Sequence, residues 1–311
     1  MYTLEWEERI NKRYTLSLTV YFDKGGIGMD SYQAIWNEDM KGNGIKPISP
    51  AENREQSQGY AMVDVSGFES GHHVIKEVYI PEDKRNSYRL VERLFNNYIL
   101  NERKREKNTF SESKEVEEFL TMAIQSLPGR LTKRLVEEKS NRLFNDLQWY
   151  TYVHDLWFRQ FDSENGKDLS GFEHVFIGEQ KGRRLVGHHF WYKYWLEDQA
   201  DVNEHRKDQI EVNDSVHLES FSAAPDMITV GYHLEAFDYQ KNRFVKLAKK
   251  NSGFFVGLSP EGLLALGTLR AVLQGEVSEE CIINRVHYKL ELSMSPDGKS
   301  IRTFYPVYLP S

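Results

Sequence analysis

Residues 171–195 read GFEHVFIGEQKGRRLVGHHFWYKYW, and this stretch decides how the functional part of the chain is predicted to fold. Its pattern on either side of Lys181-Gly182 is typical of two antiparallel strands joined by a two-residue turn. In a hairpin with that turn, His174 is expected to lie opposite His189, on the same face of the sheet. His188 is expected to point to the opposite face, because successive strand residues alternate.

Two imidazoles on one face can exchange protons with a substrate near neutral pH. The unperturbed pKa of histidine is about 6.5, so one ring can be neutral while its neighbour is charged. Cleavage of RNA by its own 2′-hydroxyl needs a base for that hydroxyl and an acid for the 5′-oxygen leaving group. It also needs a cation beside the phosphate oxygens, and Lys193 is expected further along the same face.

Two other interpretations of the histidine pair stay open at this point. A metal site needs further ligands, and Glu173 and Glu179 are expected to alternate to the wrong face of the hairpin. The histidines can also be hydrogen-bonded and inert, which is the default interpretation in the absence of other motifs.

Composition indicates a globular protein with a sizeable core. The chain has 311 residues, of which 40% are hydrophobic and 13% aromatic. Its apolar runs are far shorter than the ~20 residues of a membrane span, and the N-terminus lacks the apolar region of a signal peptide. We therefore expect a cytoplasmic protein with no membrane partner. The single cysteine, Cys281, excludes an internal disulfide and a thiolate metal cage.

Charge is distributed unevenly along a chain whose net charge is −7. Residues 180–195 and 239–250 both contain lysines and arginines but no acidic residue. Such local patches can attract phosphates while the whole chain stays acidic, although a single patch is more often a solvated face.

The predicted elements indicate an α+β protein with a boundary in the charged stretch 101–113. The first 110 residues are expected to be strand-rich, with a long loop at 37–59, a helix at 88–100, and strands at 14–22, 61–65 and 74–80. Beyond the boundary, Thr109 and Glu112 fit a capping box, and helices are expected at 114–127, 131–139 and 143–161. Strands dominate from residue 171, except for a helix that begins at Ser259-Pro260-Glu261.

Four strings occur in a characteristic order along the second part of the chain. They are GFEHVFIGE at 171–179, GHHFW at 187–191, SGFFVGLSPE at 252–261 and TFYP at 303–306. Together they resemble the EndoU family of endoribonucleases in its cellular and bacterial form, and more distantly the coronavirus uridylate-specific endoribonuclease. The resemblance covers residues 114–311. It implies that residues 111–311 form a catalytic domain with a helical layer and antiparallel sheets around a groove, preceded by a region, 1–110, of unknown role.

The resemblance implies three catalytic residues. His174 and His189 match the family's two histidines, and ungapped counting back from the SPE string places the family's lysine at Lys249, with Lys250 adjacent. We expect His189 to act as the base and His174 as the acid, with the reverse order as the alternative. Lys249 is expected to stabilise the charge on the phosphorane.

The resemblance also implies contacts to the substrate. Tyr305 is expected to stack on the sugar or the base, and Thr303 to support the site. The family's uracil-binding serine aligns with Gly253 under strict spacing, and Ser252 lies one position away. Ser252 is therefore the candidate for this contact.

The implied activity is cleavage of single-stranded RNA at uridylates, giving 2′,3′-cyclic phosphate and 5′-hydroxyl ends. The chemistry requires no cofactor or metal, but some family members are stimulated by manganese, so metal dependence stays open. The competing hypothesis is an RNA-binding module of the same fold with weak or no catalysis, suggested by Gly253 and by the choice between two lysines. No oligomeric state is predicted.

Because RNA supplies its own nucleophile, replacing the 2′-hydroxyl of the target uridine by hydrogen is expected to abolish cleavage. Gel electrophoresis of matched ribo- and deoxyuridine oligonucleotides, each with manganese and with a chelator, measures this. Cleavage of the deoxy strand that chelator suppresses would instead indicate a metal hydrolase.

Overall fold

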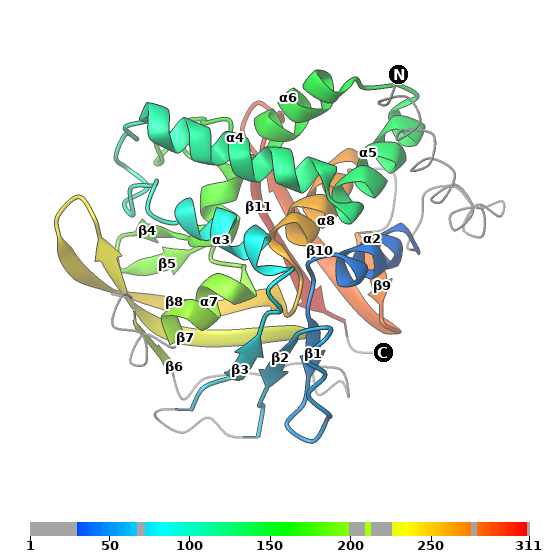
Figure 1. Cartoon of the computed structure of the whole chain (residues 1–311). Helices are drawn as coiled ribbons and strands as arrows, with labels where there is room; N and C mark the ends of the chain where they lie inside the picture. Colours follow the sequence, from blue (N-terminus) through cyan, green and yellow to red (C-terminus); the bar gives the residue numbers. More distant parts are fainter. Residues whose placement is uncertain (1–29, 67–71, 199–208, 213–225, 275–278, 310–311) are drawn as a thin grey trace.

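The computed structural model describes residues 30–66, 72–198, 209–212, 226–274 and 279–309. Figure 1 shows a mixed α+β architecture in which α4, α5 and α6 form a helical layer on one side and the long strands lie on the other. The predicted α+β class is confirmed. None of the helices in these ranges is long and apolar enough to cross a membrane.

The described part of the first 110 residues contains helices as well as strands. Its elements are α2 (Asp30–Lys41), β1 (Lys46–Ile48), β2 (Tyr60–Val63), β3 (Ile75–Tyr79) and α3 (Arg85–Arg93). β2 and β3 match the strands predicted at 61–65 and 74–80, and α3 begins and ends earlier than the predicted helix at 88–100. The predicted strand at 14–22 lies outside the described residues.

The prediction of a loop over residues 37–59 is wrong at its start. Residues 37–41 complete α2, and β1 also lies inside the range. α2 forms because Tyr32, Ile35 and Trp36 recur at helical spacing and are all buried. This signal was overlooked beside the polar residues that follow it.

The helical layer follows the predicted order. It consists of α4 (Phe110–Gln125), α5 (Leu127–Ser140) and α6 (Asp146–Trp157). The capping box of Thr109 and Glu112 is confirmed at the start of α4. Pro128 and Gly129, which fall between the helices predicted at 114–127 and 131–139, form the first turn of α5, because Ser126 caps that helix and proline is tolerated at its first positions.

Two sheets form the other side of the molecule. The larger has the strand order β4-β5-β8-β7-β6, and the smaller has the order β11-β10-β9. The strands are β4 (Glu179–Lys181), β5 (Arg184–Val186), β6 (Gln209–Val212), β7 (Met227–Asp238), β8 (Arg243–Phe255), β9 (Glu280–Ile283), β10 (Val286–Met294) and β11 (Ile301–Tyr308). All pairs in these two sheets are antiparallel except β5 and β8, which run parallel.

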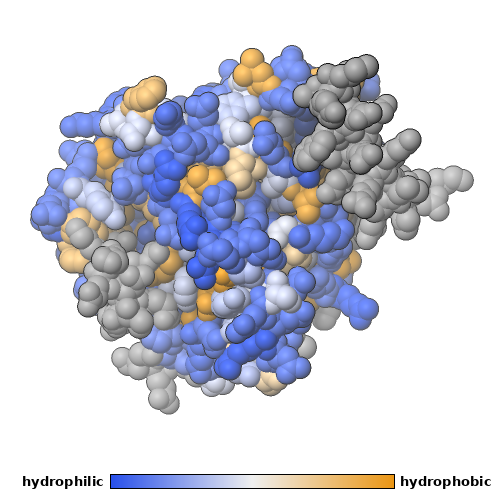
Figure 2. All heavy atoms as spheres, in the orientation of Figure 1, coloured by the Kyte–Doolittle hydropathy of each residue, from blue (hydrophilic) through white to orange (hydrophobic). Residues whose placement is uncertain are grey.

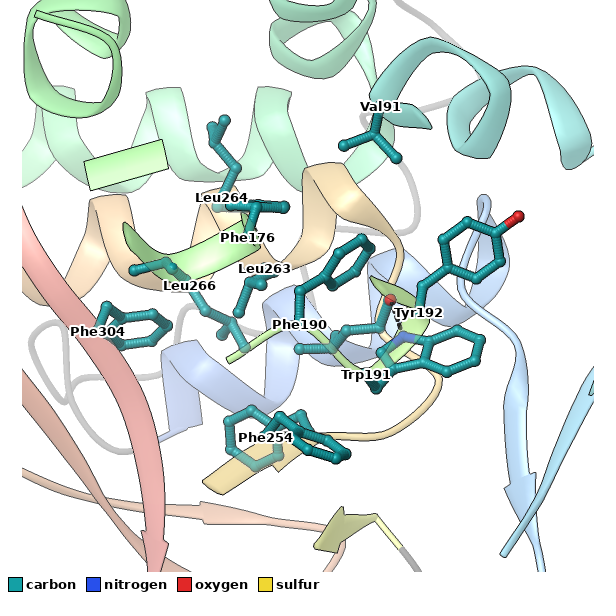
Figure 3. Close-up of a cluster of buried hydrophobic side chains, with 14 of the residues drawn as sticks. Val91, Phe176, Phe190, Trp191, Tyr192, Phe254, Leu263, Leu264, Leu266 and Phe304 are labelled. Carbon is teal, nitrogen blue, oxygen red and sulfur yellow. Dashed lines mark hydrogen bonds between the residues drawn. The ribbon is translucent and has the colours of Figure 1, made fainter. Parts of the chain in front are cut away.

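A buried helix, α8 (Pro260–Val272), packs between the helical layer and the sheets. Every residue from Pro260 to Arg270 is buried, which agrees with the predominance of apolar residues around the helix. Figure 3 shows Leu263, Leu264 and Leu266 beside Phe176, Phe190, Phe254 and Phe304 from the surrounding segments. The same buried cluster includes residues of α2 and α3, while the face seen in Figure 2 is mostly hydrophilic.

The N-terminus of α8 begins at Ser259, as predicted, and is tied to α2. The Ser259 amide donates to Asp39 Oδ2 at 2.8 Å, and the Ser259 hydroxyl donates to Asp39 Oδ1. Asp39 is fully buried. The contact therefore anchors the central helix to the N-terminal region.

Asp39→Ala is expected to lower the free energy of unfolding by about 1–3 kcal/mol, because it leaves buried donors of Ser259 without an acceptor. Denaturant titration at constant pH measures the change. Glu38→Ala is the matched control: Glu38 pairs with Lys41 near the surface at 2.7 Å, and such pairs contribute about 0–1 kcal/mol. Equal losses in the two variants would contradict the role given to Asp39.

Candidate active site

A cavity of about 820 Å³ opens between β5, β8 and β11. Its lining includes five of the six residues that the sequence analysis singled out: His174, His189, Lys249, Thr303 and Tyr305. These residues come from segments up to about 130 positions apart in the chain, so the fold assembles them. Ser252 is not part of the lining.

Backbone hydrogen bonds bring the two histidines together. The His188 amide donates to the His174 carbonyl at 2.8 Å, and the His189 amide donates to the Val175 carbonyl at 2.7 Å. The imidazole centroids lie 6.3 Å apart. The structure thus places the two rings close together, as the sequence analysis expected.

The predicted hairpin register that led to this expectation is wrong. β4 and β5 do form a hairpin, but Val186 pairs with Glu179, a shift of two residues from the register that would place His174 opposite His189. His174 lies before the hairpin in η1 (Glu173–Ile177), a short π-helical turn. The signal for a helical turn was the four-residue spacing of Phe172 and Phe176. Their rings stack with their centroids 4.5 Å apart.

Gly187 allows the close approach of the two segments. Its φ is +70°, and a Cβ at this position would lie 1.9 Å from the His174 carbonyl oxygen. Only glycine can occupy this position without displacing the backbone that carries His174.

His189 is held in its neutral form. Its Nδ1 lies 2.9 Å from the Gly253 carbonyl oxygen, which can only accept, so Nδ1 carries the proton and Nε2 keeps its lone pair. The ring stacks on Tyr305 with a centroid distance of 4.5 Å. Burial lowers the pKa of His189 well below its usual value, and the charge of Lys249 lowers it further.

His174 differs from His189 in having a carboxylate partner. Its Nδ1 lies 3.0 Å from Glu179 Oε2, and Arg302 donates two hydrogen bonds of 2.7 and 2.6 Å to the same carboxylate. Burial lowers the pKa of His174, and Glu179 partly opposes this effect. Burial would raise the pKa of Glu179, but His174 and Arg302 hold it at about 2.

Glu179 and Arg302 are the site residues that sequence reasoning missed. Glu179 was assigned to the opposite face because the whole of residues 171–180 was interpreted as one strand. The turn at Gly178, with φ +87°, interrupts that alternation and returns the carboxylate to His174. Arg302 directly precedes the TFYP string, but nothing in its spacing linked it to residue 179.

Lys249 supplies the buried cation of the cavity. Its side chain leaves β8 and donates to the Gly187 carbonyl oxygen. Lys249 is only 7% exposed, whereas Lys250 is exposed at the rim. Burial lowers the pKa of Lys249 to about 7.

Ser252 and Gly253 occupy different sides of β8. The Ser252 hydroxyl donates to the His188 carbonyl oxygen at 2.5 Å and lies behind His189, away from the cavity. Gly253 lines the cavity, and a Cβ there would lie 2.5 Å from the Pro306 carbonyl oxygen. Close packing of β8 on β11 therefore explains why this position is a glycine.

Thr303 presents an unsatisfied polar atom near the cavity. Its Oγ1 is buried and makes no hydrogen bond within the described part of the chain. A hydroxyl can donate one hydrogen bond and accept others. It is therefore available to a polar group of a bound molecule.

His188 lies behind the site, pointing away from the other two histidines as expected. Its Nδ1 contacts the Tyr232 hydroxyl, and its Nε2 lies 2.7 Å from Glu197 Oε2. Lys193 also pairs with Glu197, from α7 (Trp191–Asp198). The expectation that Lys193 shares the face of the histidine pair is wrong, because residues 191–198 form a helix and not a strand.

The residues described hold no group of three or more histidine, cysteine, aspartate or glutamate side chains that could bind a metal ion. At the histidine pair, Glu179 is already engaged by Arg302 and His174. The donor set around the cavity is therefore suited to proton transfer and to binding an anion.

Comparisons with known proteins give one consistent result. The family model described as Endoribonuclease XendoU matches residues 31–306. Uridylate-specific endoribonuclease C of Danio rerio is 28% identical over 243 residues, covering 75% of this chain and 73% of the relative. Poly(U)-specific endoribonuclease-A of Xenopus laevis is 24% identical over 237 residues, covering 74% and 76%.

The same fold is found in a solved structure. The structure of XendoU, described as a splicing independent snoRNA processing endoribonuclease, aligns with a TM-score of 0.64 at 19% sequence identity. The alignment covers 91% of this chain and 97% of the other. At this identity the likeness establishes the fold alone.

Lys249→Met is expected to stabilise the protein by a few kcal/mol below pH 7. The pKa of Lys249 is about 7 when folded, against 10.5 ordinarily, so below pH 7 the folded protein carries the cost of a buried charge. The gain should shrink between pH 7 and 10.5, where the unfolded chain binds more protons and the stability of the wild type rises. Losing the hydrogen bond from the ammonium to Gly187 costs about 1.5–3 kcal/mol, which is less than the desolvation that the substitution relieves.

Denaturant unfolding at pH 6 and pH 9 measures the effect. Lys250→Met is the control, since this exposed neighbour should change the stability by less than about 0.5 kcal/mol at either pH. A Lys249→Met variant that is less stable than the wild type at pH 6 would contradict the buried-charge interpretation.

Proposed function

The chain belongs to the XendoU family of endoribonucleases, and from this premise we propose that it cleaves single-stranded RNA at uridylates by transphosphorylation. In this reaction the 2′-hydroxyl attacks the adjacent phosphorus and the bond to the 5′-oxygen breaks. The products carry a 2′,3′-cyclic phosphate and a 5′-hydroxyl. The observation that supports this chemistry is the pair of imidazoles, each with Nδ1 engaged, beside the ammonium of Lys249 in one cavity.

The environments of the two histidines support the assignment of base and acid. His189 contacts a carbonyl, and burial together with Lys249 disfavours its protonation, so it is neutral and able to accept the 2′-proton. Burial lowers the pKa of His174 too, but the Glu179 carboxylate opposes this, so His174 is the more easily protonated ring of the two and is suited to act as the acid. Environments that push two pKa values apart in this way separate an acid from a base.

Lys249 would stabilise the charge that develops on the phosphate oxygens. A bound phosphate raises the pKa of a nearby amine, so the ammonium form is favoured when the substrate enters. A preformed cation in a cavity sheltered from water stabilises a developing negative charge more strongly than it does in water.

The uridylate would be held by β11 and by the loop that carries His189. Tyr305 orients His189 by stacking and offers an aromatic surface to the sugar or the base. The unsatisfied Thr303 hydroxyl is suited to a polar edge of uracil. We propose that Ser252 acts by holding the His188 carbonyl, and with it the position of His189, instead of touching the base.

No specific observation favours a non-catalytic RNA-binding module. Lys249 is distinguished from Lys250 by its burial and by its contact with Gly187. The glycine at position 253 is accounted for by the packing of β8 on β11. Both reasons for that hypothesis therefore have a structural explanation that is compatible with catalysis.

His174→Ala and His189→Ala are each expected to lower kcat/KM by about 10²–10⁴-fold on a uridine-containing oligonucleotide, because each removes one proton-transfer step. Gel electrophoresis measures the rate. A cyclic phosphate is detected as a 3′ phosphate that phosphatase removes only after mild acid has opened the ring. His154→Ala, a half-exposed histidine on α6, is the control and should keep full activity. Unchanged cleavage by either active-site variant, or a free 3′-hydroxyl in the product, would refute the proposal.

A further inference from the structure

The two basic stretches without acids, 180–195 and 239–250, lie side by side in the fold. β5 and β8 are neighbouring strands in which Arg184 pairs with Ala248, and the Ala248 amide donates to the Arg183 carbonyl at 3.0 Å. These segments are about 60 residues apart in the chain, and their spacing did not predict that they would combine into one surface. Their contact brings cations of both segments, Arg184 from one and Lys249 and Lys250 from the other, to one edge of the cavity.

Several cations of this surface are free to bind an anion. Arg183, Arg184, Arg243 and Lys250 are exposed. None of the four side chains forms an ion pair within the ranges that the structure describes. Arg184 and Lys250 also line the cavity, so the charged surface begins at the site of cleavage.

The surface ends in exposed aromatic side chains. β7 and β8 continue beyond the cavity as a hairpin that projects from the body of the molecule (Figure 1). At its tip Tyr239 is 54% and Phe244 50% exposed. Both rings pack against Phe237, with centroid distances of 5.1 and 5.3 Å, so they are held in place although they face solvent.

An exposed charged hairpin is often only a solvated face, and its position argues against that interpretation here. Ala248, which lines the cavity and pairs with Arg184, lies four residues from Phe244 on the same face of β8, which corresponds to roughly 13 Å at the rise of a β-strand. A bound RNA leaving the cavity along β8 would meet arginines and lysines first and aromatic rings next. Exposed aromatic rings beside lysine and arginine side chains are the combination that binds single-stranded nucleic acid without sequence preference.

We propose that the basic hairpin surface, made of Arg183, Arg184, Tyr239, Arg243, Phe244 and Lys250, binds the nucleotides that flank the cleaved uridylate. The phosphates contact the cations, and one or more bases stack on Tyr239 and Phe244. The identity of the ligand as RNA rests on the proposed function. This surface makes the enzyme prefer extended single strands over dinucleotides, through affinity and not through the chemical step.

The double variant Tyr239→Ala/Phe244→Ala tests the stacking contribution. Two substrates are compared: a uridine oligonucleotide of roughly twelve nucleotides, a length that single-strand binding surfaces accommodate, and the dinucleotide UpU, which is too short to reach the hairpin tip. The variant should raise KM for the long substrate by about ten- to a hundredfold with little change in kcat. Its kcat/KM for UpU should stay within about twofold of the wild type.

Binding is measured separately from cleavage with a fluorescein-labelled 2′-O-methyl oligouridine, which has no nucleophile. The Kd of the double variant should rise by the same factor as KM. Arg243→Ala should reduce the slope of log Kd against log salt by about 0.7, the contribution of one phosphate contact on a single strand. Phe110→Ala and Arg134→Ala, exposed residues of α4 and α5, are the controls and should bind as the wild type does.

The outcomes separate the two proposals. If the wild type cleaves both substrates and the double variant has an unchanged KM and Kd for the long strand, the hairpin surface is overturned and the proposed function stands. A double variant that loses cleavage of UpU as strongly as that of the long strand also overturns it, because the rings then act on the site itself. If the wild type cleaves neither substrate, the proposed function fails and the inference that rests on it falls too.

Discussion

The site depends on two backbone hydrogen bonds, from the amides of His188 and His189 to the carbonyls of His174 and Val175. They join a helical turn to the loop after β5, and they form only because Gly187 has no side chain to strike the His174 carbonyl. Once the two segments are joined, each imidazole has its Nδ1 beside an acceptor. Nε2 is then the nitrogen available to a substrate in both rings, so a backbone constraint sets the tautomers on which the chemistry depends.

The two buried imidazoles differ in how easily they are protonated, because their hydrogen-bond partners differ. A carboxylate held by Arg302 partners His174, whereas a neutral carbonyl partners His189. Lys249 is the cation that we propose to contact the phosphate of the substrate. Its burial is unfavourable for folding, because the charged form is desolvated. The packing of α8 and its tie to Asp39 support the sheets that carry these groups. The stability of the core thus offsets the desolvation of charged groups at the site, as is common in enzymes.

Signals between neighbouring residues were sufficient to predict much of the fold. The features that were predicted wrongly or missed depend on contacts or backbone turns that residue spacing does not show. The capping box at Thr109 and the helix start at Ser259 depend on neighbouring residues alone, and both were predicted correctly. The hairpin was placed with the wrong register because a helical turn and a glycine with positive φ broke the alternation before β4. The ion pair of Glu179 with Arg302 joins residues 123 positions apart, which no spacing rule could reveal. The family resemblance, and not the hairpin argument, led to Lys249, Thr303 and Tyr305.

His174 and His189 face one cavity, with His189 as a neutral ring protonated on Nδ1 and His174 as the ring whose protonation Glu179 favours. Long-range ¹H–¹⁵N correlation spectra of the imidazole side chains, assigned with the His174 and His189 variants, test it most directly. We expect His189 to carry its proton on Nδ1 and to remain neutral at pH 6.5, and His174 to become protonated on both nitrogens at a higher pH than His189, because Glu179 favours its charged form. A neutral His189 with its proton on Nε2, or one that is fully protonated at pH 6.5, would contradict it.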